Sequence, residues 1–252
     1  MNKDKEIEKE RYNRRSEQLI GTNNRPFWED PIASMPEYLR KPYLVWLEKI
    51  QEFANDDGEV LEIGSGAGIF TGYLLQFNFK SVIATDIAPA SIEFMKNLFN
   101  NQKGFNAKIE DIECLSFKDE SFDLVTACGV LSYGENGKVL EEIYRVLKPN
   151  GVFISVDSYS VNPFYRLNRW LHYLRGNRSK STLLRMPRPL LVKAYQKKFN
   201  DSEVLYFGSF IFLVPLLKII LSDQKIAYLM DQLDKIKILR KFAFKVVMVF
   251  RK

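Results

Sequence analysis

The sequence predicts a doubly wound α/β domain of seven strands with a C-terminal helical lid. Two observations support this prediction. A short apolar run at residues 60–63 enters a Gly-x-Gly-x-Gly turn at residues 64–68, and a helical pattern follows at once. Further apolar runs then alternate with helical patterns as far as residue 156, which predicts right-handed crossovers and a parallel sheet covered on both faces.

The expected elements follow one another in a regular order. Strands are expected at residues 60–63, 81–85, 107–111, 122–128 and 152–156, and helices at 69–77, 90–100 and 138–147. The Lys-Pro-Asn-Gly sequence at 148–151 predicts the turn before the fifth strand. Residues 201–210 and 245–251 are expected as the sixth and seventh strands, with helices at 211–241 inserted between them.

Four segments organise the chain. Residues 1–35 form a charged N-terminal helical cap, with its helix at about 6–20, and residues 36–158 form the core, which begins with an amphipathic helix at 36–53. Residues 159–200 form a basic, aromatic lid, and residues 201–252 hold the last two strands.

Composition excludes several classes of protein. The chain of 252 residues is 46% hydrophobic and 27% charged, which is ordinary for a soluble globular protein. Its two cysteines, Cys114 and Cys128, lack metal-ligand spacing and indicate a reducing compartment, and a single histidine argues against a metal site. We expect a cytoplasmic protein, because no apolar leader is present and the apolar run at 205–217 is too short to span a bilayer. Interfacial contact of that run with a membrane remains an alternative.

The motifs resemble the class I S-adenosylmethionine-dependent methyltransferases, and within them the small-molecule, type 11-like group that includes quinone and sugar methyltransferases. The resemblance covers about residues 36–158 and, more weakly, the final strand. It is carried by residues 60–70, 85–87, 109–116, 121–133 and 145–155. It implies a Rossmann-like methyltransferase sheet with an antiparallel last strand, and S-adenosylmethionine as the cofactor.

The resemblance also assigns residues to the parts of the cofactor. The methionine portion is assigned Tyr12, Glu62, Gly64, Ser65, Gly66, Gly68, Cys128 and Gly129, with Glu62 orienting its amino group. The adenosine portion is assigned Asp86, Ile87, Asp111 and Ile112. The position of Asp86, about 20 residues beyond the glycines, independently suits a carboxylate that grips two ribose hydroxyls.

The glycine turn and the two aspartates also have other interpretations. A nicotinamide or flavin site prefers Gly-x-Gly-x-x-Gly, whereas the third glycine here comes one residue early. Asp111 and Asp123 are also candidates for turn capping, and for Asp123 capping is the preferred interpretation. Nothing resembles the Asn/Asp-Pro-Pro-Tyr box or the Pro-Cys nucleophile of nucleic-acid methyltransferases, so nucleic acid is not expected as a partner.

The catalytic requirement is modest, because a sulfonium is already a strong electrophile and the main task is to position the acceptor in line. A neutral hydroxyl acceptor additionally needs a base. Asp157, at the end of the fifth strand, and His172 are candidates for that base, with strand-end capping and a solvated helix position as their alternatives. Tyr133 is expected to orient the acceptor, at a position where relatives often carry histidine.

The charge distribution suggests the kind of acceptor. Residues 1–150 carry a net charge of −7 and residues 151–252 carry +13. Between residues 158 and 200 there is no acid but ten cations, of which six are arginines. A solvated basic face is one interpretation. The sharper hypothesis is that Arg175, Arg178 and Arg185 capture an anionic or phosphate-linked acceptor, and an anionic membrane surface is a further alternative.

The sequence therefore predicts an enzyme that transfers methyl from S-adenosylmethionine to an oxygen or nitrogen of a small acceptor, such as a sugar, a lipid-linked or a carrier-linked molecule. Two rivals remain open. One is a cofactor-binding regulatory or partner subunit without catalysis, and the other is a quinone or lipid methyltransferase at the membrane surface.

Overall fold

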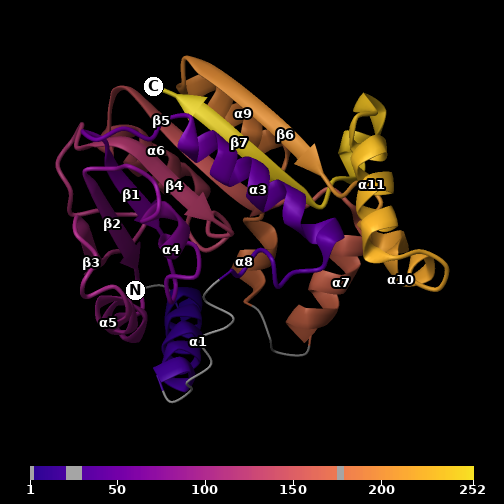
Figure 1. The fold of residues 1–252 in the computed structure, drawn as a ribbon, viewed down its shortest axis with the longest axis horizontal. Helices are drawn as coiled ribbons and strands as arrows, with labels where there is room; N and C mark the ends of the chain where they lie inside the picture. Colours follow the sequence, from indigo (N-terminus) through magenta and orange to yellow (C-terminus); the bar gives the residue numbers. More distant parts are fainter. Residues whose placement is uncertain (1–2, 21–29, 175–178) are drawn as a thin grey trace.

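The structure confirms the predicted sheet. The computed structural model describes residues 3–20, 30–174 and 179–252. The strands are β1 (Glu59–Ile63), β2 (Ser81–Asp86), β3 (Phe105–Ile109), β4 (Phe122–Cys128), β5 (Leu147–Ser158), β6 (Asp201–Phe207) and β7 (Lys245–Arg251). Across the described residues they form one seven-stranded sheet in the order β3-β2-β1-β4-β5-β7-β6 (Figure 1). β1 to β5 pair in parallel, and β7 runs antiparallel to both of its neighbours.

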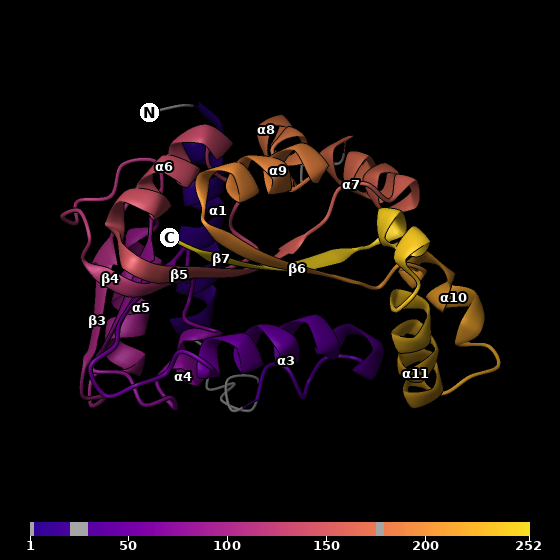
Figure 2. The ribbon, with the colours of Figure 1, turned by 90° about the horizontal axis from the view of Figure 1, so that it is seen from above.

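Helices cover both faces of this sheet, as Figure 2 shows. They are α1 (Lys3–Ile20), α3 (Glu37–Gln51), α4 (Thr71–Leu74), α5 (Pro89–Leu98), α6 (Asn136–Val146), α7 (Pro163–Leu174), α8 (Lys180–Leu184), α9 (Pro189–Lys198), α10 (Val214–Leu217) and α11 (Asp223–Asp234), with short 3-10 helices η1 (Ile211–Leu213) and η2 (Lys237–Phe242). α3 packs on one face through the fully buried Trp46 and Ile50. α6 and α9 pack on the other face, where Tyr195 stacks on Phe153 of β5.

The chain order in the sheet reverses between β1 and β4, which are neighbours in space although β2 and β3 intervene in sequence. In doubly wound sheets the crevice beside the carboxyl ends of such strands is where ligands bind. α1 packs against α5, beside the same edge of the sheet (Figure 1). A ligand site is therefore expected at the turns that follow β1, β2 and β4.

Two predicted elements are shorter in the structure. The helix expected at 69–77 is the four-residue α4, because Gly68 takes a φ of +79° and Phe70 turns inward to stack on Tyr43. The sixth strand ends at Phe207 instead of continuing to 210. Gly208 has a φ of +69°, and its amide donates to Asp234 of α11 at 2.7 Å and not to β7.

The predicted lid at 159–200 divides into two parts in the structure. α9 belongs to the core, because Leu191, Val192 and Tyr195 are buried against the sheet. α7 has no buried residue and α8 has only Thr182, so these two helices form the peripheral part. The apolar run at 205–217 divides between β6, η1 and α10. No helix in the described ranges is long and apolar enough to cross a bilayer.

Candidate functional site

The turn after β1 needs glycine for steric reasons. Gly64 has a φ of +64°, and a Cβ there would lie 2.0 Å from Val130 Cγ2. Gly68 has a φ of +79°, and a Cβ would lie 2.8 Å from Met95 Cγ. A left-handed backbone without a side chain is therefore required at both positions. The Ser65 amide donates to the carbonyl of Thr85 at 2.9 Å, which fixes the turn against the end of β2.

Asp86, the last residue of β2, closes this turn from the other side. Its Oδ2 accepts from the Gly66 amide at 2.8 Å, and its Oδ1 accepts from the Ala88 amide at 2.9 Å. A carboxylate offers about four acceptor positions, so each oxygen keeps room for one further donor. Burial raises the pKa of Asp86, and the backbone donors oppose that shift. The arrangement suits a carboxylate that accepts from two ligand hydroxyls.

A pocket opens at the carboxyl ends of β1, β2 and β4, with about 600 Å³ of empty volume including the part open to solvent. Eight of the twelve residues that the sequence assigned to the cofactor line it, namely Tyr12, Gly64, Asp86, Ile87, Asp111, Ile112, Cys128 and Gly129. Tyr133 lines it as well, and so do residues that the sequence did not suggest, namely Lys5, Glu8, Glu110 and Val130.

The lining is compatible with S-adenosylmethionine. Ile87 and Ile112 supply apolar walls of the kind that a nucleobase requires. Gly129 has a φ of +70°, and nothing lies within 4 Å of the point where a Cβ would stand, so bare backbone faces open space there. Burial raises the pKa of the Cys128 thiol, which therefore stays neutral. The residues present thus fit a ligand that carries an adenosine group and a polar tail.

Glu62, Ser65, Gly66 and Gly68 are the four assigned residues that lie in the strand and turn beside the pocket without lining it. Glu62 is 2% exposed, and Thr71 Oγ1 donates to its Oε2 at 2.6 Å. Burial raises the pKa of Glu62 to about 7, with the Thr71 hydroxyl opposing that shift. Glu62 is therefore a carboxyl that gains or loses its proton near neutral pH.

Asp111 has two protein partners. Lys5 Nζ lies 2.6 Å from its Oδ2, and the Glu113 amide donates to its Oδ1 at 3.0 Å. The carboxylate thus caps its own turn, as the alternative interpretation predicted, and also holds α1. Asp123 does not line the pocket, and its Oδ2 accepts from the Glu59 amide at 2.9 Å and from Lys148 Nζ at 2.8 Å, so it joins β4 to the start of β1 and to Lys148.

α1 places a polar cluster over the pocket. Arg11 donates to Tyr133 Oη at 3.1 Å, and Tyr12 Oη lies 3.3 Å from the same atom. Glu8 is 6% exposed and lines the pocket, and no described residue gives either of its carboxylate oxygens a hydrogen bond. Arg11 Nη2 lies 2.9 Å from Glu8 Oε2 as an ion pair. Lys5, Glu8 and Tyr12 share one helix face at i, i+3 and i+7, the signal from which sequence reasoning could have found Glu8.

The other two candidate catalytic residues lie elsewhere. Asp157 is 2% exposed and is near Tyr195 and Leu131, on the face of the sheet that α9 covers, and it does not line the pocket. Burial raises its pKa to about 7. His172 is partly exposed on α7 and is also absent from the pocket lining. The structure therefore brings Tyr133, but neither Asp157 nor His172, to the predicted cofactor residues.

The predicted acceptor residues are only partly described. Arg175 and Arg178 lie outside the described residues. Arg185 follows α8, and its carbonyl accepts from Asn136 Nδ2 at 3.3 Å. Because Asn136 begins α6, three residues after Tyr133, this bond joins the basic segment to the loop that borders the pocket.

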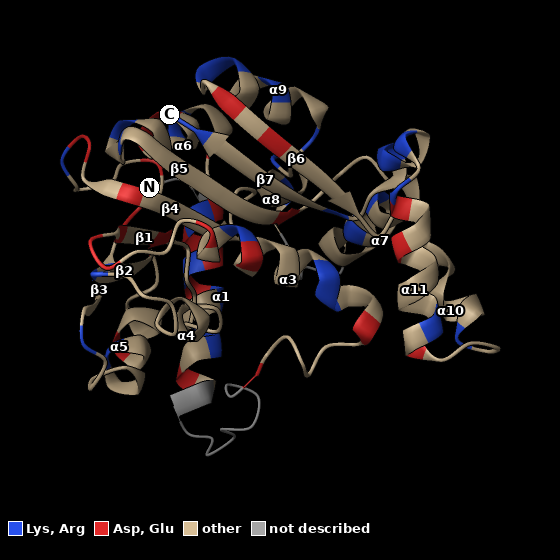
Figure 3. Cartoon of the chain, turned by 45° about the horizontal axis from the view of Figure 1, so that its top comes forward, with Lys and Arg blue, Asp and Glu red and all other residues tan. Residues whose placement is uncertain are grey.

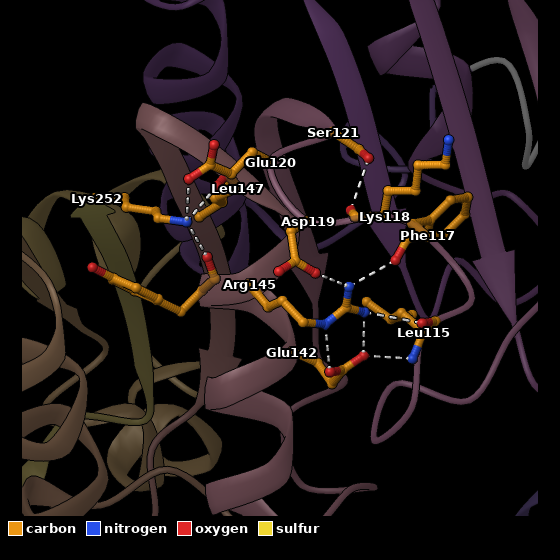
Figure 4. A network of polar contacts seen from close by, with 11 residues as sticks. Leu115, Phe117, Lys118, Asp119, Glu120, Ser121, Glu142, Arg145, Leu147 and Lys252 are labelled. Carbon is orange, nitrogen blue, oxygen red and sulfur yellow. Dashed lines mark hydrogen bonds and ion pairs between the residues drawn. The ribbon is translucent and has the colours of Figure 1, made fainter.

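Arg145 of α6 anchors the connection between β3 and β4, as Figure 4 shows. Its guanidinium donates to the carbonyls of Leu115 and Phe117 and pairs with Asp119 and Glu142. Because Glu142 also accepts from the Leu115 amide at 2.7 Å, both backbone groups of Leu115 are held. The loop that begins with Asp111 and Ile112 is thereby fixed against the sheet.

Comparison with known proteins identifies this arrangement. Residues 61–155 match the family model described as a methyltransferase domain. An uncharacterized methyltransferase of Schizosaccharomyces pombe is 36% identical over 136 residues, which cover 53% of this chain and 51% of that protein. The ubiquinone/menaquinone biosynthesis C-methyltransferase of Rickettsia typhi is 34% identical over 122 residues, 44% of this chain and 48% of that protein. The chain thus spans about half the length of these relatives.

The fold agrees with this match. The crystal structure of a SAM-dependent methyltransferase from Archaeoglobus fulgidus superposes with a TM-score of 0.57 at 17% identity, covering 86% of this chain and 96% of that one. At this identity the likeness shows the fold. The sequence match, the fold and the lining of the pocket agree with one another, and the match implies S-adenosylmethionine as the cofactor. Residues 61–155 of this chain thus match a methyltransferase domain.

Proposed function

We propose that this chain transfers a methyl group from S-adenosylmethionine to an oxygen or nitrogen atom of a small, anionic acceptor. The pocket beneath α1 carries the proposal, because eight of the residues expected to hold the cofactor converge there and Glu8 and Tyr133 line the same space. When bound, the cofactor supplies an electrophilic methyl group. The chain then has to hold the acceptor in line and receive its proton where the acceptor has one.

The cofactor roles in this proposal are those that the family resemblance implies, and the position of the residues in the pocket lining supports them. Asp86 would accept from the ribose hydroxyls, and Ile87 and Ile112 would pack on the adenine. Asp111 holds Lys5 at 2.6 Å, so in this proposal it keeps α1 closed over the ligand as well as bordering the adenine. Gly64, Gly129 and Tyr12 border the methionine portion, beside the buried Glu62.

The acceptor end lies at Tyr133. Its hydroxyl is held by Arg11 and Tyr12, which supports a role in orienting an acceptor. Glu8 is a carboxylate of the pocket lining that is only 6% exposed, and Arg11 Nη2 pairs with its Oε2 at 2.9 Å. In this proposal Glu8 receives the acceptor's proton. It thus takes the role of base for which the sequence suggested Asp157 or His172.

An anionic acceptor is supported by the basic segment after β5. The bond between Asn136 and Arg185 brings that segment next to the loop that carries Tyr133. Arg185, together with Arg175 and Arg178, is expected to capture phosphate or carboxylate oxygens in this proposal.

A quinone or lipid acceptor is the second candidate. It is favoured by the relative named as a quinone C-methyltransferase and by the exposed apolar side chains of α7. A cofactor-binding subunit without catalysis is the candidate from another class.

A screen with radiolabelled S-adenosylmethionine separates these three functions. Label is expected in nucleotide-linked sugars or other phosphate-bearing acceptors. Label in quinones or lipids would favour the second candidate. Binding of the cofactor without label in any acceptor class, alone or with added partner proteins, would favour the subunit.

A further inference from the structure

Helix α7 exposes an apolar face that the described part of the chain covers only in part. None of its residues is buried. Phe164, Leu167, Leu171 and Leu174 recur at the spacing of one helix face, and they are 54%, 56%, 39% and 59% exposed. Trp170 beside them is 48% exposed. A globular protein normally turns such a face to its core, and an uncovered apolar patch of this kind marks an interaction surface.

The face continues into a groove between α7 and α8. Leu167 and Trp170 line one side, Leu183 and Leu184 line the other, and Arg166 and Arg188 border it, around about 820 Å³ that includes open solvent. At the start of α7, Phe164 stacks on Phe212 of η1 with ring centroids 4.3 Å apart. η1 leads into α10, where Leu216 is 66% exposed. Apolar side chains from three neighbouring segments thus reach solvent.

The segment that carries α7, α8 and α9 has charges of one sign. Residues 159–200 contain no Asp or Glu. Figure 3 shows blue and tan, without red, along α7 and α9. Among the described cations of this segment, Lys198 pairs with a carboxylate, that of Glu141 at 2.7 Å, and no other cation has such a partner. An apolar face surrounded by uncompensated cations is complementary to a surface that is negative outside and apolar beneath.

We infer that α7, α8 and the groove between them dock this chain on an anionic phospholipid surface. The apolar stripe enters the boundary between headgroups and acyl chains, and Arg166, Arg188 and the neighbouring cations contact lipid phosphates. Nucleic acid would match the cations but not the exposed leucines. The surface adjoins the pocket through the bond between Asn136 and Arg185, so a docked chain holds the loop that carries Tyr133 near the lipid.

Co-sedimentation of the full-length protein with vesicles tests the inference. Binding is expected to vesicles of phosphatidylcholine with 30% phosphatidylglycerol, and to fall at high salt. It should be at least tenfold weaker to phosphatidylcholine alone. Leu167→Glu combined with Leu171→Glu should abolish binding. Each of Arg166→Ala and Arg188→Ala should weaken it about fivefold, since one basic side chain near the surface contributes about 1 kcal/mol.

Leu44→Glu is the matched control. Leu44 is 53% exposed on α3, which covers the opposite face of the sheet, so this variant should bind vesicles like the wild type. The thermal unfolding temperature and the affinity for S-adenosylhomocysteine should be unchanged in all variants. These two measurements distinguish a loss of docking from a loss of folding and from a loss of the proposed reaction.

Three results would overturn the inference. The first is equal binding of the wild type to neutral and anionic vesicles, and the second is an equal loss of vesicle binding in the Leu44→Glu control. The third is a dimer in solution that the Leu167 and Leu171 substitutions dissociate while vesicle binding stays unchanged. The last result would assign the face to a second copy of the chain.

Discussion

Glu62 should make the stability of the cofactor-free protein fall as pH rises toward neutrality. Its folded-state pKa is raised to about 7 by burial, against an ordinary value of 4.5. A carboxyl with a raised folded pKa holds its proton more tightly when folded, so its full stabilising contribution is present below pH 4.5. That contribution is lost as pH rises through about 7. At about 1.4 kcal/mol for each pKa unit, the loss is about 3 kcal/mol.

Glu62→Gln removes the titration and keeps an oxygen that can accept from Thr71 Oγ1, whose distance to Glu62 is 2.6 Å. Urea unfolding at pH 5 and pH 8 measures the effect. The wild type should lose about 2–3 kcal/mol more than the variant over this interval. Asp157, the other buried carboxyl with a pKa raised to about 7, contributes equally to both proteins and cancels in the difference. Glu48→Gln, at an exposed position on α3, should leave the pH dependence unchanged. An identical slope in the wild type and the Glu62 variant would refute the reasoning.

Three further predictions concern the pocket. Asp86→Ala should weaken S-adenosylhomocysteine binding by about 1.5–3 kcal/mol in calorimetry, through lost charge-assisted hydrogen bonds, and unchanged affinity would remove Asp86 from the site. Glu8→Gln should lower kcat by ~10²–10⁴ on a hydroxyl acceptor, while Tyr133→Phe raises the acceptor's KM and both keep their cofactor affinity. Full turnover of the Glu8 variant would exclude it as the base. Asp157→Asn and His172→Ala should keep turnover because neither side chain lines the pocket, and a loss of ~10²–10⁴ in either would return the base role to it.

The parallel half of the fold could be predicted because its signals are local. Val60, Leu61 and Ile63 are almost fully buried, as a strand covered on both faces requires, and the following glycines form the predicted turn with a left-handed backbone. The seventh strand, at Lys245–Arg251, was predicted within the same bounds. The end of β6 was missed, because it depends on Asp234, which is distant in sequence and accepts from the Gly208 amide.

The sequence predicted only part of the site, because contacts between elements distant in sequence decide the rest. Residues on the turns after β1, β2 and β4 converge because strand order alone brings these turns together. Glu8 was missed, since a charged helix in the N-terminal cap is ordinarily solvated and only its packing on α5 turns that face toward the pocket. Asp157 does not line the pocket, because side chains alternate along β5 and Asp157 shares with Phe153 the face that α9 covers, near Tyr195.

Calorimetric titration of the purified chain with S-adenosylhomocysteine, and in parallel with NADH, tests the central claim most directly. The account predicts stoichiometric binding of S-adenosylhomocysteine, weakened by Asp86→Ala, and no measurable heat from NADH. Tight binding of NADH together with none of S-adenosylhomocysteine would contradict it.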